Sequence, residues 1–226
     1  MISAVQQIIR IVIVDDHPIV REGIKQIVSP HSDLAIVAEA NNGEEALATL
    51  RIQPCDVVLL DISLPGINGV EVLKRIRAEH SQLQTLVLSI HPEEIYGMRV
   101  LRAGAAGYLT KASMTPQDLV GAIRKVGRGG RYITPTLAEY LACGFQLDRD
   151  RESARSILSE REYQTMCLLA DGKTVTEIAV ALSLSVKTIS TYRTRILEKL
   201  HFRNNAELMR YAIKEAGVLS PSATTR

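Results

Sequence analysis

The feature that most constrains the fold of this chain is the regular exchange of short apolar runs with longer amphipathic runs over residues 10–127. The short runs are continuously apolar, as strands buried on both faces of a sheet are. They are Ile11–Val14, Leu34–Ala38, Val57–Leu60, Thr85–Leu88 and Gly107–Leu109. The longer runs between them are Ile19–Val28, Glu44–Leu50, Val70–Ala78, Glu93–Ala103 and Pro116–Val126. This alternation predicts an α/β domain with a doubly wound, five-stranded parallel sheet.

A second, all-helical domain is predicted after a charged segment, LDRDRESARS (residues 147–156), that is nearly devoid of large apolar residues and is typical of a linker. Beyond it, Ser159 and Thr174 each begin a Ser/Thr-x-x-Glu capping box, which opens a helix. Two further helices are expected over residues 185–200 and 206–216. The predicted division is a first domain over 9–127, a linker over 128–156, a four-helix domain over 157–217 and a disordered tail over 218–226.

Charged and hydroxyl side chains follow the ends of the predicted strands. Asp15 and Asp16 follow the first strand, Asp61 the third, Ser89 the fourth and Lys111 the fifth. In the strand order 2-1-3-4-5 the first and third strands are neighbours, so three carboxylates meet at one edge of the sheet. A hard divalent cation such as Mg²⁺ would relieve their repulsion. Raised pKa values, which keep a carboxyl group protonated and neutral, are the alternative. Three carboxylates, a cation and a hydroxyl together predict a phosphoryl acceptor site.

Each of these residues taken alone also fits an ordinary structural role. An aspartate after a strand is commonly a helix cap or a turn residue, and a single lysine is commonly exposed. Their common position at the strand ends of one domain favours the functional interpretation.

The motifs VIVDDHP, LLDISLPGING, VLSIH and GYLTKA, in this order and spacing, resemble the receiver domain of two-component response regulators over about residues 9–127. The resemblance implies that a partner sensor histidine kinase phosphorylates Asp61. It also implies a Mg²⁺ site made by Asp15, Asp16, Asp61 and the backbone carbonyl of Ser63.

The same resemblance implies roles for three further side chains. Ser89 would bond the phosphoryl group, Lys111 would pair with it, and Tyr108 would reorient as the signal spreads. Ser63 and His91 occupy positions that influence the lifetime of the phosphoryl group in receivers. His91 itself is interpreted as a turn residue.

The predicted helix over residues 185–200 has one apolar face and one polar face. At about 100° per residue, Ile189, Ile196 and Leu200 fall on one side, which predicts a core face. Small hydroxyl residues dominate the opposite side, which would allow the helix to enter a DNA major groove while flanking cations reach phosphates. A solvated helix surface is the alternative, and Glu198 on the polar face favours it. His201 has to close this helix, where a left-handed conformation is less easy than for glycine.

The stretch from LSEREYQ to RILEKL (residues 158–200) resembles the four-helix output domain of LuxR-type regulators, and with the receiver it is similar to the NarL/FixJ subfamily of response regulators. The resemblance implies double-stranded DNA as a partner, a homodimer when phosphorylated, and RNA polymerase as a further contact. On this mapping Ser190, Thr191 and Thr194 face base edges, and Lys187, Arg193 and Lys199 reach phosphates.

An adaptor is the competing function, in which the receiver works by protein contact and the helical domain binds no DNA. A nucleotide-binding enzyme is excluded. Gly172-Lys173-Thr174 resembles the end of a phosphate-binding loop, but Cys167 stands where that loop needs its first glycine, and no strand precedes it. We therefore expect a regulator that accepts a phosphoryl group but turns over no substrate.

The chain shows no targeting or membrane-spanning pattern. Its first apolar run, residues 8–14, is broken by Arg10 and leads directly into Asp15. The three cysteines have no metal-ligand spacing and are expected to be reduced thiols. These observations predict a cytoplasmic protein that makes no contact with a membrane.

Overall fold

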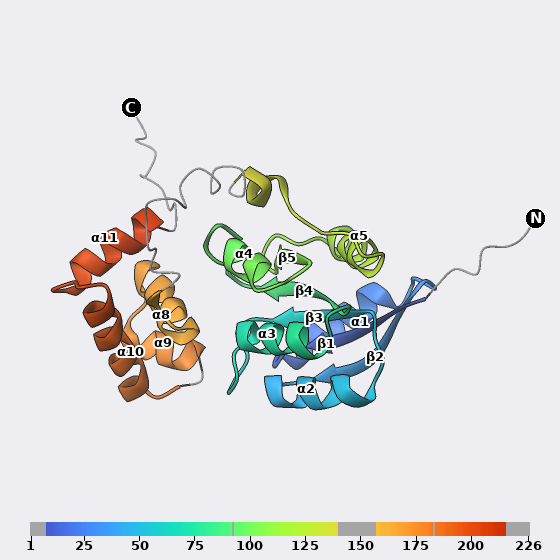
Figure 1. Cartoon of the computed structure of the whole chain (residues 1–226), viewed down its shortest axis with the longest axis horizontal. Coiled ribbons are helices and arrows are strands. Elements are labelled where there is room, and N and C mark those ends of the chain that lie inside the picture. Colours follow the sequence, from blue (N-terminus) through green and yellow to red (C-terminus); the bar gives the residue numbers. More distant parts are fainter. Residues whose placement is uncertain (1–7, 92, 140–156, 183, 216–226) are drawn as a thin grey trace, which may run out of the picture. The chain divides into compact units, whose positions relative to one another are not determined.

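The computed structural model describes residues 8–91, 93–139, 157–182 and 184–215. The chain forms two compact units, Met1–Glu139 and Tyr140–Arg226 (Figure 1). The first contains a parallel sheet and the second is helical, which confirms the predicted fold classes. Residues 140–156 of the expected linker and the expected tail lie outside the described residues, so the domain boundaries stay predictions.

The sheet of the N-terminal unit has five parallel strands in the order β2-β1-β3-β4-β5, as predicted. The strands are β1 (Ile9–Val14), β2 (Leu34–Ala40), β3 (Val57–Asp61), β4 (Gln84–Ser89) and β5 (Gly107–Thr110). Their register pairs Val14 with Leu60, and Ser89 with Thr110. The carboxyl ends of β1, β3, β4 and β5 therefore reach the same edge of the sheet.

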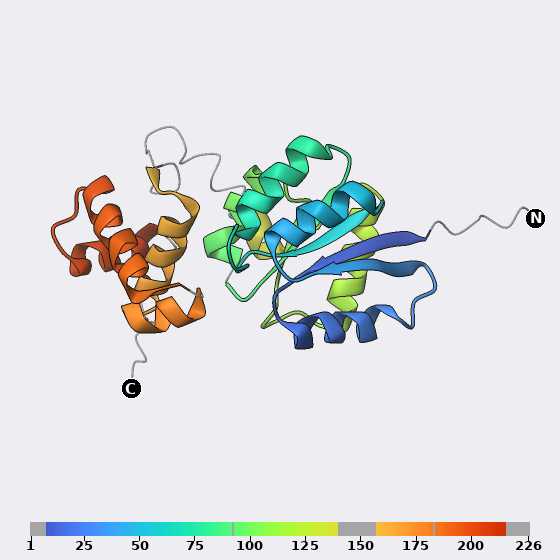
Figure 2. The same ribbon diagram turned by 90° about the horizontal axis from the view of Figure 1, so that it is seen from below.

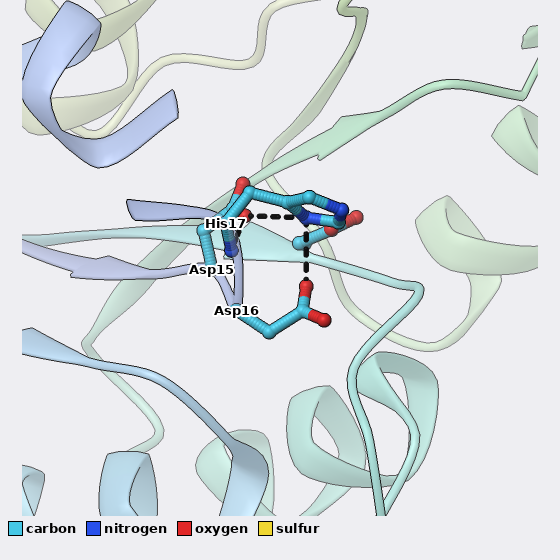
Figure 3. Close-up of side chains that lie close together, drawn as sticks. Asp15, Asp16 and His17 are labelled. Carbon is cyan, nitrogen blue, oxygen red and sulfur yellow. Dashed lines mark hydrogen bonds and ion pairs between the residues drawn. The ribbon is translucent and has the colours of Figure 1, made fainter. Parts of the chain in front are cut away.

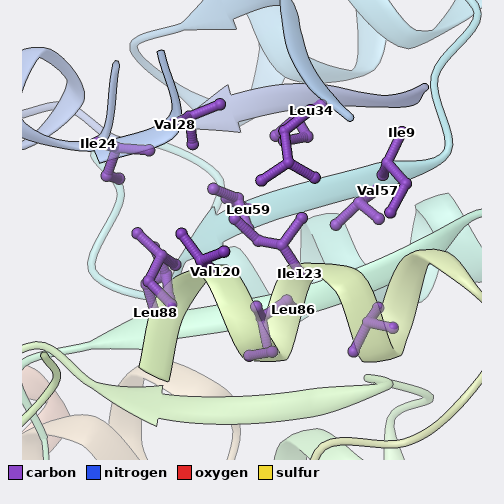
Figure 4. Close-up of a cluster of buried hydrophobic side chains, with 14 of the residues drawn as sticks. Ile9, Ile24, Val28, Leu34, Val57, Leu59, Leu86, Leu88, Val120 and Ile123 are labelled. Carbon is purple, nitrogen blue, oxygen red and sulfur yellow. The ribbon is translucent and has the colours of Figure 1, made fainter. Parts of the chain in front are cut away.

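Helices cover both faces of this sheet. They are α1 (Pro18–Val28), α2 (Gly43–Ile52), α3 (Gly69–Glu79), α4 (Glu93–Arg102) and α5 (Pro116–Gly127). Figure 2 shows α1 on one face and α2 and α3 on the other. Ile24 and Val28 of α1 join Val120 and Ile123 of α5 in one core with the side chains of alternate strand positions (Figure 4). Burial of this continuous apolar core is the main stabilising contribution to the unit.

The described part of the expected linker packs on the N-terminal unit. The Tyr132 N–H donates to the Ala106 carbonyl at 2.9 Å, next to β5. Leu137, within the short helical stretch 135–139, is fully buried. A Cβ on Gly97 of α4 would lie 2.6 Å from Leu137, so the missing side chain makes room for the leucine. The chain thus remains attached to β5 and α4 after α5 ends.

Four helices are described in the C-terminal unit: α8 (Glu160–Ala170), α9 (Val175–Ala181), α10 (Val186–Lys199) and α11 (Asn205–Glu215). Both predicted capping boxes are confirmed, at the starts of α8 and α9. Ile189 and Ile196 of α10 are fully buried, as the predicted core face requires. His201 closes α10 with φ of 56°, and the Phe202 N–H donates to the Leu197 carbonyl at 2.8 Å, which together form a Schellman cap.

Gly69, the first residue of α3, packs closely against the backbone of Asp61 and Ile62 at the end of β3. A Cβ at this position would lie 2.2 Å from the Asp61 carbonyl oxygen and 2.5 Å from the Ile62 Cα. Gly69→Ala should therefore force the backbone apart and lower the free energy of unfolding by about 1–3 kcal/mol, as overpacking does. Urea unfolding of the full chain, followed by far-ultraviolet circular dichroism, measures this.

Gly23→Ala in α1 is the matched control, since no atom lies within 4 Å of its added Cβ. It should raise the free energy of unfolding by about 0.5–1 kcal/mol, because alanine restricts the unfolded chain more than glycine does. Equal stabilities of the two variants would contradict the close approach at Gly69.

Candidate functional site

Three carboxylates meet at the carboxyl edge of the sheet, as predicted. Asp61 is the last residue of β3, and Asp15 and Asp16 follow β1, which pairs with β3. One ligand atom from each of these residues and one from His17 all lie within 4.8 Å of one another. Asp15 and Asp61 are 1% and 2% exposed. A set of converging carboxylate oxygens fits a hard divalent cation, and the arrangement is consistent with a metal site.

Lys111, just after β5, binds two of these carboxylates at once. Its Nζ lies 2.6 Å from Asp15 Oδ2 and 2.9 Å from Asp61 Oδ2. The Lys111 backbone N–H donates to the Ser89 carbonyl at 2.7 Å, which ties the end of β5 to the end of β4. The ammonium is mostly buried, with 12% of the side chain exposed. It therefore supplies a fixed positive charge inside the acidic cluster.

Burial and neighbouring charges together shift the pKa values of Asp61 and Lys111. Burial raises the pKa of Asp61, the Lys111 ammonium opposes this, and the neighbouring Asp15 carboxylate adds to it, so that the pKa of Asp61 stays above its ordinary value. Burial alone would lower the pKa of Lys111, but the Asp61 and Asp15 carboxylates outweigh it and leave that pKa raised. Lys111 therefore keeps its charge, while ionised Asp61 has lost much of its hydration.

Two residues at the site were not identified from the sequence. Figure 3 shows the His17 ring between the carboxylates of Asp15 and Asp16, with Nδ1 3.2 Å and 2.9 Å from their oxygens. The Arg21 guanidinium of α1 donates to the Asp15 carbonyl at 2.7 Å and to Glu39 at 3.0 Å. His17 could have been noticed because it adjoins the aspartate pair. Arg21 has no such signal, because it lies within α1 and its partner Glu39 lies far along the chain, on β2.

The remaining predicted residues form a chain of contacts beside the cluster. The Ser63 N–H donates to Asp61 Oδ1 at 3.1 Å. The buried Ser89 hydroxyl accepts the His91 N–H at 3.1 Å, and the Tyr108 hydroxyl donates to the His91 carbonyl at 2.7 Å. His91 also stacks on Tyr96, with ring centroids 4.7 Å apart. Tyr108 is thus connected to Ser89 through the His91 backbone.

In the C-terminal unit, α10 presents an exposed polar face opposite its core face. Lys187, Ser190, Thr191 and Thr194 are all exposed. α9 ends at Ala181 and α10 begins at Val186, a spacing typical of a helix-turn-helix.

Two of the predicted phosphate contacts of α10 have partners within the unit. Arg193 Nε donates to Asn205 Oδ1 at 2.6 Å. Lys199 Nζ lies 2.6 Å from Glu162 Oε2, whose side chain is 4% exposed. Glu162 also accepts the Ser159 N–H at 2.7 Å in the capping box of α8. Lys199 and Arg193 therefore help to hold α10 against α8 and α11.

Two family models match the chain. The response regulator receiver domain matches residues 11–124, and the bacterial regulatory proteins of the luxR family match residues 156–212. The chain belongs to the LuxR-type response regulators. It is a two-component response regulator with a receiver domain and a LuxR-type DNA-binding domain, and it is a transcription regulator rather than an enzyme with a turnover reaction.

Named relatives cover nearly the whole response regulator. Response regulator UvrY of Escherichia coli strain K12 is 39% identical over 206 residues, covering 91% of this chain and 94% of the relative. Response regulator GacA of Pseudomonas viridiflava is 38% identical over 215 residues, covering 95% of this chain and 100% of the relative. The RcsB–DNA complex is a similar solved structure, with 27% identity, a TM-score of 0.57, and coverage of 91% of this chain and 98% of that chain.

Among the described residues of the response regulator, no helix has the length and apolar character needed to cross a membrane.

The Glu162–Lys199 pair predicts a pH dependence of stability. Burial alone would raise the pKa of Glu162, but the bonds from Lys199 and Ser159 hold that pKa below its ordinary value. Its charge therefore stabilises the fold above the glutamate pKa of the unfolded chain, about 4.3, and this contribution is lost as pH falls through the lower folded pKa. Allowing for the partly exposed ammonium, Glu162→Gln should cost about 1 kcal/mol at neutral pH and progressively less below about pH 4.

Thermal unfolding of wild type and variant over this pH range measures the difference. Glu198→Gln, at an exposed position of α10, is the control and should change stability little at either pH. A Glu162→Gln effect that does not shrink with acid would contradict the ion-pair assignment.

Proposed function

We propose that Asp61 accepts a phosphoryl group from a sensor histidine kinase and that this modification promotes DNA binding by the output domain. The observation that carries this proposal is the ionisable, buried Asp61 held beside two further carboxylates and the Lys111 ammonium. An Asp61 carboxylate oxygen attacks phosphorus, the new P–O bond forms as the P–N bond of the donor phosphohistidine breaks, and the leaving imidazole keeps the electron pair and takes up a proton.

Each neighbouring group has a role in this transfer. Asp15, Asp16, Asp61 and the Ser63 carbonyl would hold Mg²⁺, which when bound neutralises charge on the phosphoryl oxygens. Lys111 would exchange its contact with the Asp61 carboxylate for one with the phosphoryl group. The three carboxylates of this cluster are oxygen donors, which supports the choice of a hard cation.

The signal would leave the site through Ser89. When the Ser89 hydroxyl turns to donate to the phosphoryl group, its bond from the His91 N–H is disturbed. His91 is also the residue whose carbonyl holds the Tyr108 hydroxyl, so Tyr108 would reorient with it. The result is a changed receiver surface, which alters dimerisation or contacts between the domains.

DNA binding and dimerisation are supported by relatives. RcsB of Salmonella has been solved bound to a promoter in the presence of the phosphomimetic BeF₃⁻. Another solved structure contains two RcsB dimers bound to two parallel DNAs. On this basis α10 of the present chain would enter the major groove, with Lys187, Ser190, Thr191 and Thr194 toward the DNA. A phosphorylated homodimer would present two such helices. We place this activity in the cytoplasm, where a regulator of this family meets its kinase, DNA and RNA polymerase.

Asp61→Asn should abolish Mg²⁺-dependent labelling by a small phosphoryl donor such as acetyl phosphate, because an amide cannot serve as the nucleophile. Gel separation of phosphorylated from unphosphorylated full-length chain measures this. Asp56→Asn is the control, since Asp56 precedes the other end of β3 and pairs with Arg10. It should label like the wild type. Labelling of Asp61→Asn at another residue would refute the site assignment.

Lys187→Ala should weaken DNA binding and reduce the slope of log affinity against log salt by about one, the loss of one phosphate contact. Lys199→Ala should change the slope less, because Glu162 already compensates its charge. Binding of the phosphorylated chain to labelled genomic fragments at several salt concentrations measures both slopes. Absent or salt-insensitive binding would instead favour the adaptor function.

A further inference from the structure

The exposed face of α10 offers few hydrogen-bond donors to DNA bases. The Thr191 hydroxyl donates to the Lys187 carbonyl at 3.0 Å, and the Thr194 hydroxyl donates to the Ser190 carbonyl at 3.1 Å. Each threonine hydroxyl therefore donates its proton to a backbone carbonyl in the preceding turn of the helix. What these two threonines retain for a ligand is a methyl group and an oxygen that can only accept.

An apolar side chain is exposed on the same face. Val186, the first residue of α10, is 48% exposed. It lies on one stripe with Ser190 and Thr194, at steps of four residues. The N-terminal residues of a recognition helix are those that contact base edges, so Val186 stands where sequence is read.

Two of the four long cationic side chains of α10, Arg193 and Lys199, are engaged with residues of the other helices of the unit. Arginine and lysine recognise guanine through its O6 and N7 atoms. Arg193 donates instead to Asn205, and Lys199 pairs with the buried Glu162. Both contacts are 2.6 Å long and lie within the output domain. Arg193 would have to break its bond to Asn205, and Lys199 its bond to Glu162, before either side chain could turn toward a base.

Methyl groups, by contrast, have one specific partner in the major groove. Only thymine presents a methyl group there, and valine or threonine methyls pack against it. We propose that α10 recognises thymine 5-methyl groups through Val186, Thr191 and Thr194, so that the operator half-sites carry thymines at the positions beneath these side chains. The proposal rests on the DNA binding proposed above and specifies what that binding reads.

Replacement of thymine by deoxyuracil tests this, since it removes the methyl group and leaves the base-pairing edge unchanged. Duplexes are first selected from a random-sequence pool with the phosphorylated full-length chain, and the retained sequences are then synthesised with either base. We expect affinity to fall about fourfold for each contacted thymine, the value of one buried methyl group.

A double-mutant cycle assigns the contact to Val186. Val186→Ala should weaken binding to the thymine duplex about threefold to fourfold, and should leave binding to the corresponding deoxyuracil duplex nearly unchanged, because the methyl partner is already absent. Val180→Ala is the matched control: Val180 is 78% exposed but lies on α9. It should leave the thymine-to-uracil ratio at its wild-type value.

The outcomes separate this proposal from the function on which it rests. Strong binding with equal affinity for thymine and deoxyuracil duplexes would overturn methyl recognition and leave DNA binding in place. A uracil effect that persists undiminished in Val186→Ala would overturn the role of Val186. Failure to retain any duplex at low salt would overturn the proposed DNA binding itself.

Discussion

The contact of the Lys111 ammonium with both Asp15 and Asp61 is the interaction on which the receiver site depends. Two carboxylates that are nearly inaccessible to solvent would repel each other and be poorly hydrated without a cation between them. Lys111 joins the ends of β1, β3 and β5, strands that are not all neighbours in the sheet. In the proposed function, a phosphoryl group on Asp61 would give Lys111 a larger and more negative partner than the carboxylate it contacts in this structure.

The backbone next to Asp61 and Lys111 is held by close packing and by a hydrogen bond. Gly69 has no room for a side chain against the Asp61 carbonyl, and Lys111 is tied through its own N–H to Ser89. Further along, Thr134 donates to Glu93, the first residue of α4, at 2.5 Å, and Leu137 fills the space at Gly97. Within the N-terminal unit, these contacts therefore connect α4 to the segment 134–137 that follows α5.

The sequence predicted the fold and the meeting of the carboxylates because both depend on patterns that the chain carries locally. Continuous apolar runs indicated buried parallel strands, and the residues that end those runs necessarily share an edge. Apart from His17, which adjoins its partners Asp15 and Asp16, what it missed involves partners distant in sequence. Arg21 donates to the Asp15 carbonyl and is itself held by Glu39 of β2, and Lys199 pairs with Glu162 from another helix. Periodicity placed Lys199 beside the polar face of its helix but could not show that this charge was already compensated.

The two units each contain a buried carboxylate paired with a lysine, but the surroundings give the two ion pairs different roles. In the receiver, Lys111 contacts two carboxylates that converge with a third, so the cluster has carboxylate oxygens that Lys111 does not bind, which is consistent with a metal site. In the output domain, Glu162 has its Oε2 occupied by both Lys199 and the Ser159 N–H, which leaves a helix cap and a packing contact. The first cluster has more acceptors than donors and favours a ligand. The charges of the second are balanced within the fold, which is why the proposed base contacts were assigned to the small, methyl-bearing residues of α10 rather than to Lys199.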